Sequence, residues 1–351
     1  MLIVLKTCVV ILIANLTWKE SFLVSYIIRR IFYAIPILIG VNILTFLLFF
    51  TVNTPDDMAR LQLGNKYVTT EAILHWKQAN GYDRPAFYDS EAQGLKKITH
   101  TLFFQKTFDL FTFNFGSSQQ GRNIGYDVMH RMWPSLALAV PTFMIGLAIN
   151  ISLALLIVFF RRTYLDLWGL GLCMILISIS TLFYVIGGQY LFAKVLRLVP
   201  ISGYEPGLMA IKFLILPVVI GVVSGVGAGV RWYRTIFLEE VEKEYVLSAR
   251  AQGLSEGVIL FKYILKNGMI PVLTSVVVVI PTLFLGSLIM ESFFGIPGLG
   301  SYTIDAINQQ DFEIVRVMVF LGTLFYIVGL ILTDISYTLV DPRVRLVRSS
   351  P

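Results

Sequence analysis

The sequence predicts an all-α polytopic membrane protein with six core transmembrane helices, and three observations lead to this fold class. Apolar residues make up 56% of the 351-residue chain and charged residues only 14%, whereas soluble domains carry about 25% charged residues. The apolar residues gather in long stretches, and most lysines and arginines lie in the short segments between them. This composition excludes an ordinary cytosolic enzyme, a nucleic-acid-binding domain and a disordered chain.

Six apolar stretches have the length of a transmembrane helix, which needs about 20 residues to cross roughly 30 Å of hydrocarbon. They lie at residues 31–52, 135–160, 165–187, 208–230, 271–294 and 315–340. We therefore divide the chain into an uncertain N-terminal extension (1–25), a first transmembrane helix (26–52), an external polar insert (53–134), a five-helix core (135–345) with a long loop at 231–270, and a tail (346–351).

The extension at residues 1–25 is apolar up to Leu16 except for Lys6 and Thr7, which makes it short for a membrane span. Three interpretations are open: a signal-like segment, an amphipathic helix lying on the membrane, and sequence upstream of the true start codon. We favour the last two equally and assign no function to this segment.

The distribution of positive charge predicts that both termini are cytoplasmic and that the insert lies outside, because short cytoplasmic loops carry an excess of Lys and Arg. In this orientation the short outside loops contain only Lys194 and Arg197, with Lys212 and Arg316 near membrane ends. The inside segments contain Arg29, Arg30, Arg161, Arg162, Arg231, Arg234, Lys243, Arg250, Lys262, Lys266, Arg343, Arg345 and Arg348. The net charge of +6 is therefore mainly a topology signal, and no nucleic-acid partner is predicted.

The external insert is predicted to be a small structured element. Thr69 and Thr70 can cap a helix that runs to residue 79, and residues 81–85 form a turn. Near-alternate apolar residues predict an extended segment further on; they are Phe108, Leu110, Phe113 and Phe115. The aromatic residues of the insert could line a peptide path or contact a partner, and the favoured alternative is packing against the rim of the membrane domain.

The loop at residues 231–270 is longer than a connection between two spans requires. Good helix formers predict a helix at 238–252, Gly253 is expected to end it, and Ser255 can cap a second helix. Pro271 is expected to open the next span. This arrangement is typical of a docking element for a soluble cytoplasmic partner. The alternative is an amphipathic helix that rests on the bilayer.

Two carboxylates in apolar surroundings are candidate polar sites. Asp334 lies in the last predicted span, where a charge is costly and marks a functional position. Pairing with an arginine or a backbone amide is the favoured hypothesis, and a proton relay is the alternative. Glu291 is interpreted as a gate or as an anchor for an external loop, which Pro297, Gly298 and Gly300 would hold as a rigid turn.

No catalytic residue, metal site or bound cofactor is predicted. The sequence contains no nucleotide-binding Gly-x-x-x-x-Gly-Lys-Ser/Thr stretch, and its three histidines, His75, His100 and His130, all fall in the insert. Cys8 and Cys173 lie in separate apolar stretches, which is typical of buried small hydrophobic residues and not of a disulfide or a metal site.

Residues 245–255, with Asn267, Ile270 and Pro271, resemble the cytoplasmic loop of the membrane subunits of binding-protein-dependent ABC importers, in its peptide-permease version. Further segments resemble the B-type subunit of dipeptide and oligopeptide permeases in the order that this family requires. These segments are residues 26–30, 35–36, 81–85, 115–118, 199–204, 291–300, 305–311 and 334–343. In the third span the family usually has a Ser-Ile-Pro-Ser-Phe kink, whereas this chain has Ser178, Ile179 and Ser180 without a proline.

The resemblance implies a permease of the type I ABC importer kind, located in the bacterial inner membrane, that imports di- or oligopeptides. Its implied partners are a second homologous permease subunit, one or two cytoplasmic ATPase subunits, a periplasmic solute-binding protein and membrane lipid. ATP and Mg²⁺ would be bound by the ATPase subunits. The short helix of the loop would act as a coupling helix in an ATPase groove, with Ala249 and Ala251 keeping it slim and Arg250 pairing with an ATPase carboxylate. The implied coupling residues are Tyr245, Ala249, Arg250, Ala251, Gly253 and Leu254.

Three alternatives accompany this hypothesis. The first is an importer of nickel chelates or another small solute in the same family. The second is an ion-coupled secondary transporter that uses Asp334 as its proton site. The third is a membrane-embedded enzyme, which is disfavoured because no predicted span carries a paired His, Asp or Ser constellation.

Overall fold

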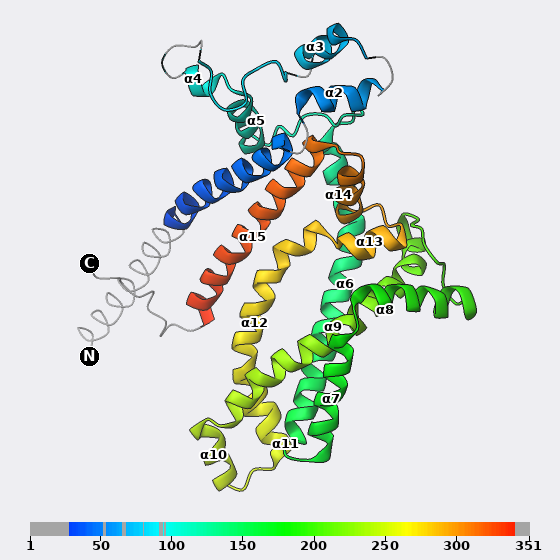
Figure 1. Ribbon diagram of the computed structural model, residues 1–351. Coiled ribbons are helices and arrows are strands. Elements are labelled where there is room, and N and C mark those ends of the chain that lie inside the picture. The colour runs from blue at the N-terminus through cyan, green and yellow to red at the C-terminus, as the bar shows by residue number, and fades with distance from the viewer. Residues whose placement is uncertain are drawn as a thin grey trace, which may run out of the picture. The chain divides into compact units, whose positions relative to one another are not determined.

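The computed structural model describes residues 28–51, 54–64, 68–79, 81–90, 94 and 96–340, so the extension at 1–25 and the tail at 346–351 lie outside the described residues. Within these ranges the protein is almost entirely helical, which confirms the all-α fold class (Figure 1). Five described helices are long and apolar enough to cross a membrane, and one bent pair of helices, Tyr164–Ser178 with Thr181–Val195, meets the same criterion only when the two are taken together. The chain forms two compact units, one of Met1–Gly125 with Asp311–Pro351 and one of Tyr126–Gln310.

The first unit combines the helix Ile28–Thr51, the last long helix α15 (Phe312–Val340) and the polar insert. The two long helices run side by side (Figure 1) and are joined near both ends. Arg30 Nη2 lies 2.8 Å from Asp334 Oδ2, and the rings of Phe49 and Phe312 are 4.3 Å apart. The helices of the insert are α2 (Pro55–Leu63), α3 (Thr70–Ala79), α4 (Lys96–Thr99) and α5 (Leu102–Phe111).

The helix predicted at the start of the insert is confirmed. α3 begins at Thr70, and the amide of Ala72 donates to Thr69 Oγ1 at 3.3 Å. The turn predicted at residues 81–85 is also present, with Gly81 at φ +73°.

The extended segment predicted over Phe108, Leu110, Phe113 and Phe115 is wrong for its first half, because Phe108 and Leu110 lie in α5, whereas Phe113 and Phe115 follow the end of this helix. Thr101 caps this helix by accepting a hydrogen bond from the Phe104 amide at 3.3 Å. The buried residues Leu102 and Leu110 are eight positions apart, a spacing that places them on one face of a helix. The near-alternate spacing of the aromatic residues therefore did not indicate which side chains are buried.

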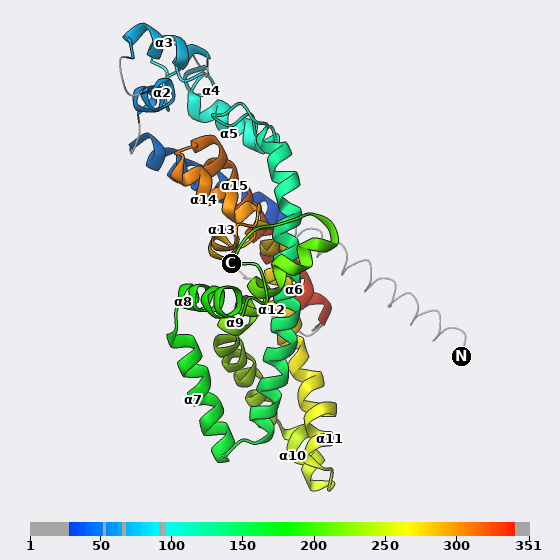
Figure 2. The ribbon, with the colours of Figure 1, turned by 90° about the vertical axis from the view of Figure 1, so that its right-hand side faces the viewer.

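The second unit holds the remaining long helices (Figures 1 and 2). α9 packs against α7, α8 and α12. α10 and α11 lie at one end of this unit, away from α13 and α14. The elements are α6 (Ile124–Phe159), α7 (Tyr164–Ser178), α8 (Thr181–Gly188) with the π-helical segment Gln189–Val195, the 3-10 turn Gly207–Met209, α9 (Ala210–Val241), α10 (Glu244–Ala251), α11 (Glu256–Ile259), the π-helical segment Leu260–Ile264, α12 (Leu265–Thr282), the 3-10 turn Leu283–Leu285, α13 (Leu288–Phe294) and α14 (Leu299–Asn308).

The third predicted span is broken although it contains no proline. Tyr164–Ser178 and Thr181–Val195 meet at an angle of 85°, and the two residues between them, Ile179 and Ser180, are extended. A helix end leaves carbonyl groups without partners, and here the hydroxyl of Tyr184 donates to the carbonyl of Leu176 at 2.9 Å. A tyrosine in the second helix thus satisfies a carbonyl that the break sets free.

The expectation that Pro271 begins a helix is also wrong. Pro271 lies inside α12, and the apolar helical stretch is continuous over Glu256–Leu285. Membrane helices tolerate an internal proline where the freed backbone groups find other partners. Gly286, at φ +70°, ends this stretch, so Glu291 belongs to the separate helix α13.

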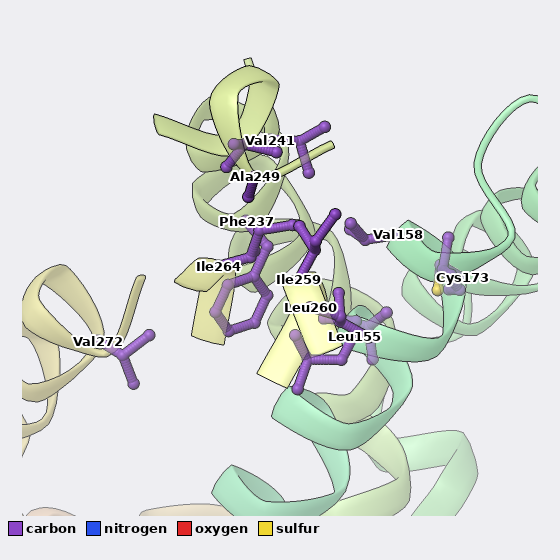
Figure 3. Packing of buried hydrophobic residues seen from close by; sticks show 14 residues of the cluster. Leu155, Val158, Cys173, Phe237, Val241, Ala249, Ile259, Leu260, Ile264 and Val272 are labelled. Carbon is purple, nitrogen blue, oxygen red and sulfur yellow. The ribbon is translucent and has the colours of Figure 1, made fainter. Parts of the chain in front are cut away.

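A cluster of buried apolar side chains lies at the end of the second unit where α10 is found (Figure 3). Phe237 of α9 is fully buried, and a side chain at Gly268 of α12 would come within 2.6 Å of its ring. Figure 3 shows Val241, Ala249 and Ile264 gathered around Phe237. The α9, α10 and α12 segments are therefore joined in one packed body by close contact.

Candidate functional site

The helix predicted at 238–252 is divided between the end of α9 and α10. The second predicted helix is present as α11, with Ser255 at its N-cap position but without a hydrogen bond from the cap side chain. α9 ends at Val241, and α10 begins at Glu244 after Lys243, which is extended at φ −69°, ψ 147°. Val241, Val246 and Ala249 are all buried in the apolar cluster. A turn between α9 and α10 allows these residues to face the same cluster, so tertiary packing overrides the helix propensity of this segment. We call residues 242–256 the docking loop.

One face of α10 is buried and the other is exposed. Val246 is 0% and Ala249 3% exposed, whereas Leu247 is 56% exposed and Ala251 lies on the exposed side. The two alanines therefore differ in role: Ala249 packs into the chain's own core, and only Ala251 lies where it can keep an outer surface slim. The exposed face of α10 contains Leu247, which was not among the residues selected from the sequence.

Gly253 ends the short helix with a left-handed backbone conformation at φ +79°. No heavy atom lies within 4 Å of the position that a Cβ would take. A positive φ, and not the close approach of another backbone, is therefore what favours glycine at this position. The Gly253 amide donates to the Arg250 carbonyl at 2.9 Å, and half-buried Leu254 packs on the apolar cluster.

Tyr245 fastens the first turn of α10 to the end of α9. Its hydroxyl donates to Glu240 Oε2. Burial, together with this hydrogen bond to a carboxylate, raises the pKa of Tyr245 to about 12. Tyr245 is therefore a neutral hydrogen-bond donor at physiological pH.

Two groups of ion pairs line a cavity of about 600 Å³ beside α10, which Leu247 also lines. Arg250 Nε lies 2.8 Å from Glu256 Oε1, and Arg161 Nη2 lies 3.6 Å from Glu256 Oε2. The Arg250 and Arg161 guanidinium groups outweigh partial burial and lower the pKa of Glu256. On another wall of the cavity, Arg234 binds both oxygens of Asp166 at 2.7–3.1 Å. Local sequence patterns gave no signal for the Arg161–Glu256 and Arg234–Asp166 pairs, because the partners of each pair lie far apart along the chain.

Glu291 is the centre of a second polar site, which we call the Glu291 hub. Its side chain is 0% exposed and accepts hydrogen bonds from the amides of Gly300 at 2.7 Å, Ser301 at 3.1 Å and Ser287 at 3.1 Å. Ser135 donates a side-chain hydrogen bond to Glu291 and accepts one from the Leu299 amide at 2.8 Å. One carboxylate thus ties together α6, α13 and the start of α14.

The glycines selected from the sequence fit tightly around this carboxylate. A Cβ at Gly298 would lie 2.2 Å from Glu291 Oε2, and one at Gly300 would lie 2.6 Å from the Ser287 carbonyl carbon. Pro297, by contrast, is exposed. Burial raises the pKa of Glu291, and the hydrogen bonds that it accepts oppose this shift only in part. The geometry is that of a loop anchor, and the gate hypothesis stays a prediction.

Asp334 forms an ion pair with Arg30 at 2.8 Å. This contact matches the favoured hypothesis of pairing with an arginine, whereas the alternative role as a proton relay stays a prediction. Over the described parts of the chain, no group of three or more His, Cys, Asp or Glu residues is placed to hold a metal ion.

Comparisons with known proteins cover almost the whole chain. The family model described as "Binding-protein-dependent transport system inner membrane component" matches residues 135–346, and the model of its N-terminal part matches residues 23–138. A putative peptide transport system permease protein of Brucella abortus is 30% identical over 92% of this chain and 99% of its own length. A dipeptide transport system permease protein of Alkalihalophilus pseudofirmus is 25% identical over 92% of this chain and 100% of its own length. A glutathione transport system permease protein of Salmonella paratyphi A is 27% identical over 92% of this chain and 99% of its own length.

Proposed function

Because the chain belongs to the family of binding-protein-dependent transport system inner membrane components, we propose that it is the permease subunit of an ATP-driven peptide importer and forms half of its translocation path. The relatives named for peptide, dipeptide and glutathione transport support a peptide-like substrate. The observation that carries the coupling part of the proposal is α10, a short helix with an exposed outer face and a buried inner face.

In this proposal the chain works with a second permease subunit, one or two cytoplasmic ATPase subunits and an external solute-binding protein. ATP and Mg²⁺ are bound by the ATPase subunits. α10 and both termini face the cytoplasm, in agreement with the Lys and Arg content of the short connections. The chain itself does not hydrolyse ATP, and it forms part of the path along which the substrate crosses the membrane.

The packing of α10 supports a lever mechanism. Val246 and Ala249 are buried with Phe237 of α9 and Ile259 of α11 in one apolar cluster. A packed interior transmits displacement because it has little free volume. A push on the exposed face around Leu247 would therefore move α9 and α12 together, and the bundle would rock between inward-open and outward-open states.

The test is Gly253→Val in the complete importer, reconstituted in liposomes. A left-handed backbone costs an L-residue about 1–2 kcal/mol, which corresponds to roughly a tenfold change in population, and a β-branched residue is a particular outlier there. We expect membrane insertion to be intact and substrate-stimulated ATP hydrolysis and uptake to fall by about tenfold.

The matched control is Gly253→Asn, because Asn enters the left-handed region more readily than Val. This variant should retain most of the activity. Uptake and stimulated hydrolysis at wild-type levels in Gly253→Val would reject the lever mechanism. Uptake that continues without ATP and stops on addition of a protonophore would instead support the secondary transporter with Asp334 as its proton site.

A further inference from the structure

The docking loop leaves the helical conformation both before and after α10. The orientation of α10 therefore depends on the contacts of its side chains and not on a continuous helix. Lys243 is extended before α10, and Gly253 is left-handed after it. The apolar contacts of Val246 and Ala249 hold the buried face against the cluster. Apolar contacts are non-directional, so they fix the depth of the helix better than its angle.

A directional contact is supplied by Glu256, the first residue of α11. Its Oε1 lies 2.8 Å from Arg250 Nε, and its Oε2 lies 3.4 Å from Arg250 Nη2. The same Oε2 lies 3.6 Å from Arg161 Nη2 in the turn between α6 and α7. The carboxylate therefore links the last turn of α10, the start of α11 and the α6–α7 turn.

The neighbouring acids of the cavity do not make this link. Asp166 is paired with Arg234, which joins α7 to α9 without contacting α10. Glu242 lines the same cavity but forms no ion pair with another residue in the described part of the chain. Among these three acids, Glu256 is the one whose charge bridges α10 and a separate connection of the bundle.

The geometry points to Glu256 as the positioning residue that sets the angle of α10, and hence the transport obtained per ATP hydrolysed; this inference rests on the proposed function. The side chain is 48% exposed, and exposed ion pairs shift populations only by about two- to fivefold. Glu256 therefore favours one orientation of the coupling helix and still allows it to move. The partner that the structure gives Arg250 is Glu256, within the same chain, and not an ATPase carboxylate.

The position of α10 can be measured without ATPase activity. Spin labels at Leu247→Cys on α10 and Tyr164→Cys at the start of α7, both exposed positions, report the distance between α10 and the α6–α7 connection. The background carries alanine at Cys8 and Cys173. We expect Glu256→Gln to broaden the distance distribution in the complete importer and Glu242→Gln to leave it unchanged. High salt should broaden the distribution of the wild type and have no further effect on Glu256→Gln.

Transport is measured in the same importer without labels. Glu256→Gln is expected to lower uptake per ATP hydrolysed by about two- to fivefold, and Glu242→Gln should not. Because Arg250 and Glu256 act as one contact, Arg250→Gln combined with Glu256→Gln should cost less than the sum of the two single changes. Additive losses in this cycle would overturn the inference.

An unchanged distance distribution in Glu256→Gln would also overturn the inference, whatever the transport result. A broadened distribution with wild-type uptake per ATP would support Glu256 as the residue that positions α10, and would reject the lever part of the proposed function. The distance measurement therefore tests the positioning role of Glu256, and the transport measurement separately tests the lever mechanism.

Discussion

Glu291 and Glu256 are both glutamates in the first turn of a short helix, but their surroundings are opposite. Glu291 is fully buried and accepts hydrogen bonds from three backbone amides and the Ser135 hydroxyl. Glu256 is half exposed and is bound by the guanidinium groups of Arg250 and Arg161. Burial raises the pKa of Glu291, and the arginines lower the pKa of Glu256.

The difference shows how one residue type can fix one loop and leave another adjustable. Backbone donors have little freedom, and breaking their hydrogen bonds inside the protein leaves unsatisfied groups. Arginine side chains are flexible, and water can replace them at an exposed carboxylate. We therefore expect the Glu291 hub to behave as a rigid joint and the docking loop as a movable one.

The largest expected effect that separates the two sites is the loss of the carboxylate itself. Glu291→Ala leaves the amides of Ser287, Gly300 and Ser301 without their acceptor and should lower the free energy of unfolding by about 3–5 kcal/mol. Glu256→Ala should cost less than about 1 kcal/mol. Thermal unfolding of the two variants in the same detergent measures the contrast. Equal losses would show that the two sites do not differ in rigidity.

A smaller effect is expected from adding one methyl group. Gly300→Ala would place a Cβ 2.6 Å from the Ser287 carbonyl carbon, and this overpacking against backbone should cost about 1–3 kcal/mol. The matched control is Gly257→Ala in α11, where no heavy atom lies within 4 Å of the new Cβ. Alanine favours a helix, so the control should be neutral or slightly stabilising. Destabilisation by both changes to the same extent would contradict the close packing of the Glu291 hub.

The smallest expected effect is a difference in the sign of the pH dependence. A carboxyl whose pKa is raised on folding, such as Glu291, contributes stability that is fully present below its ordinary value of 4.5 and is lost as the pH rises through the raised pKa. A carboxyl whose pKa is lowered, such as Glu256, contributes stability that is present above 4.5 and is lost as the pH falls through the lowered pKa.

Unfolding midpoints over a pH series separate the two contributions. The wild type should lose stability as the pH rises above 4.5, and Glu291→Gln should abolish that part of the loss. The wild type should also lose stability as the pH falls below 4.5, and Glu256→Gln should abolish that part. The same slope in both variants as in the wild type would show that these carboxyls do not titrate as described.

Sequence analysis predicted the features that depend on local pattern. The long apolar stretches marked the membrane-length helices, and capping by Thr69 marked the start of α3. The glycine at position 253 indicated the end of a helix, because few other residues adopt the positive φ that often follows one. Asp334 was expected to pair with an arginine because an isolated charge is costly inside a membrane.

The sequence could not predict where helices break under tertiary packing. The third span bends at Ile179 and Ser180 without a proline, and Tyr184 satisfies a carbonyl that the bend exposes. α9 and α10 separate at Lys243 because Val241 and Val246 share one apolar cluster. Helix propensity is a weak local preference, and burial of several side chains outweighs it.

By itself, then, the sequence determined the membrane-spanning all-α class, the insert and the short helix that Gly253 ends, because composition, length, apolar runs and glycine positions are properties of the chain. Only the tertiary structure decided the partners of the charges: Arg30 for Asp334, Ser135 and backbone amides for Glu291, and Arg161 with Arg250 for Glu256. The physical reason is that a charge is satisfied by whatever donor folding brings within hydrogen-bonding distance, and that donor can lie anywhere along the chain.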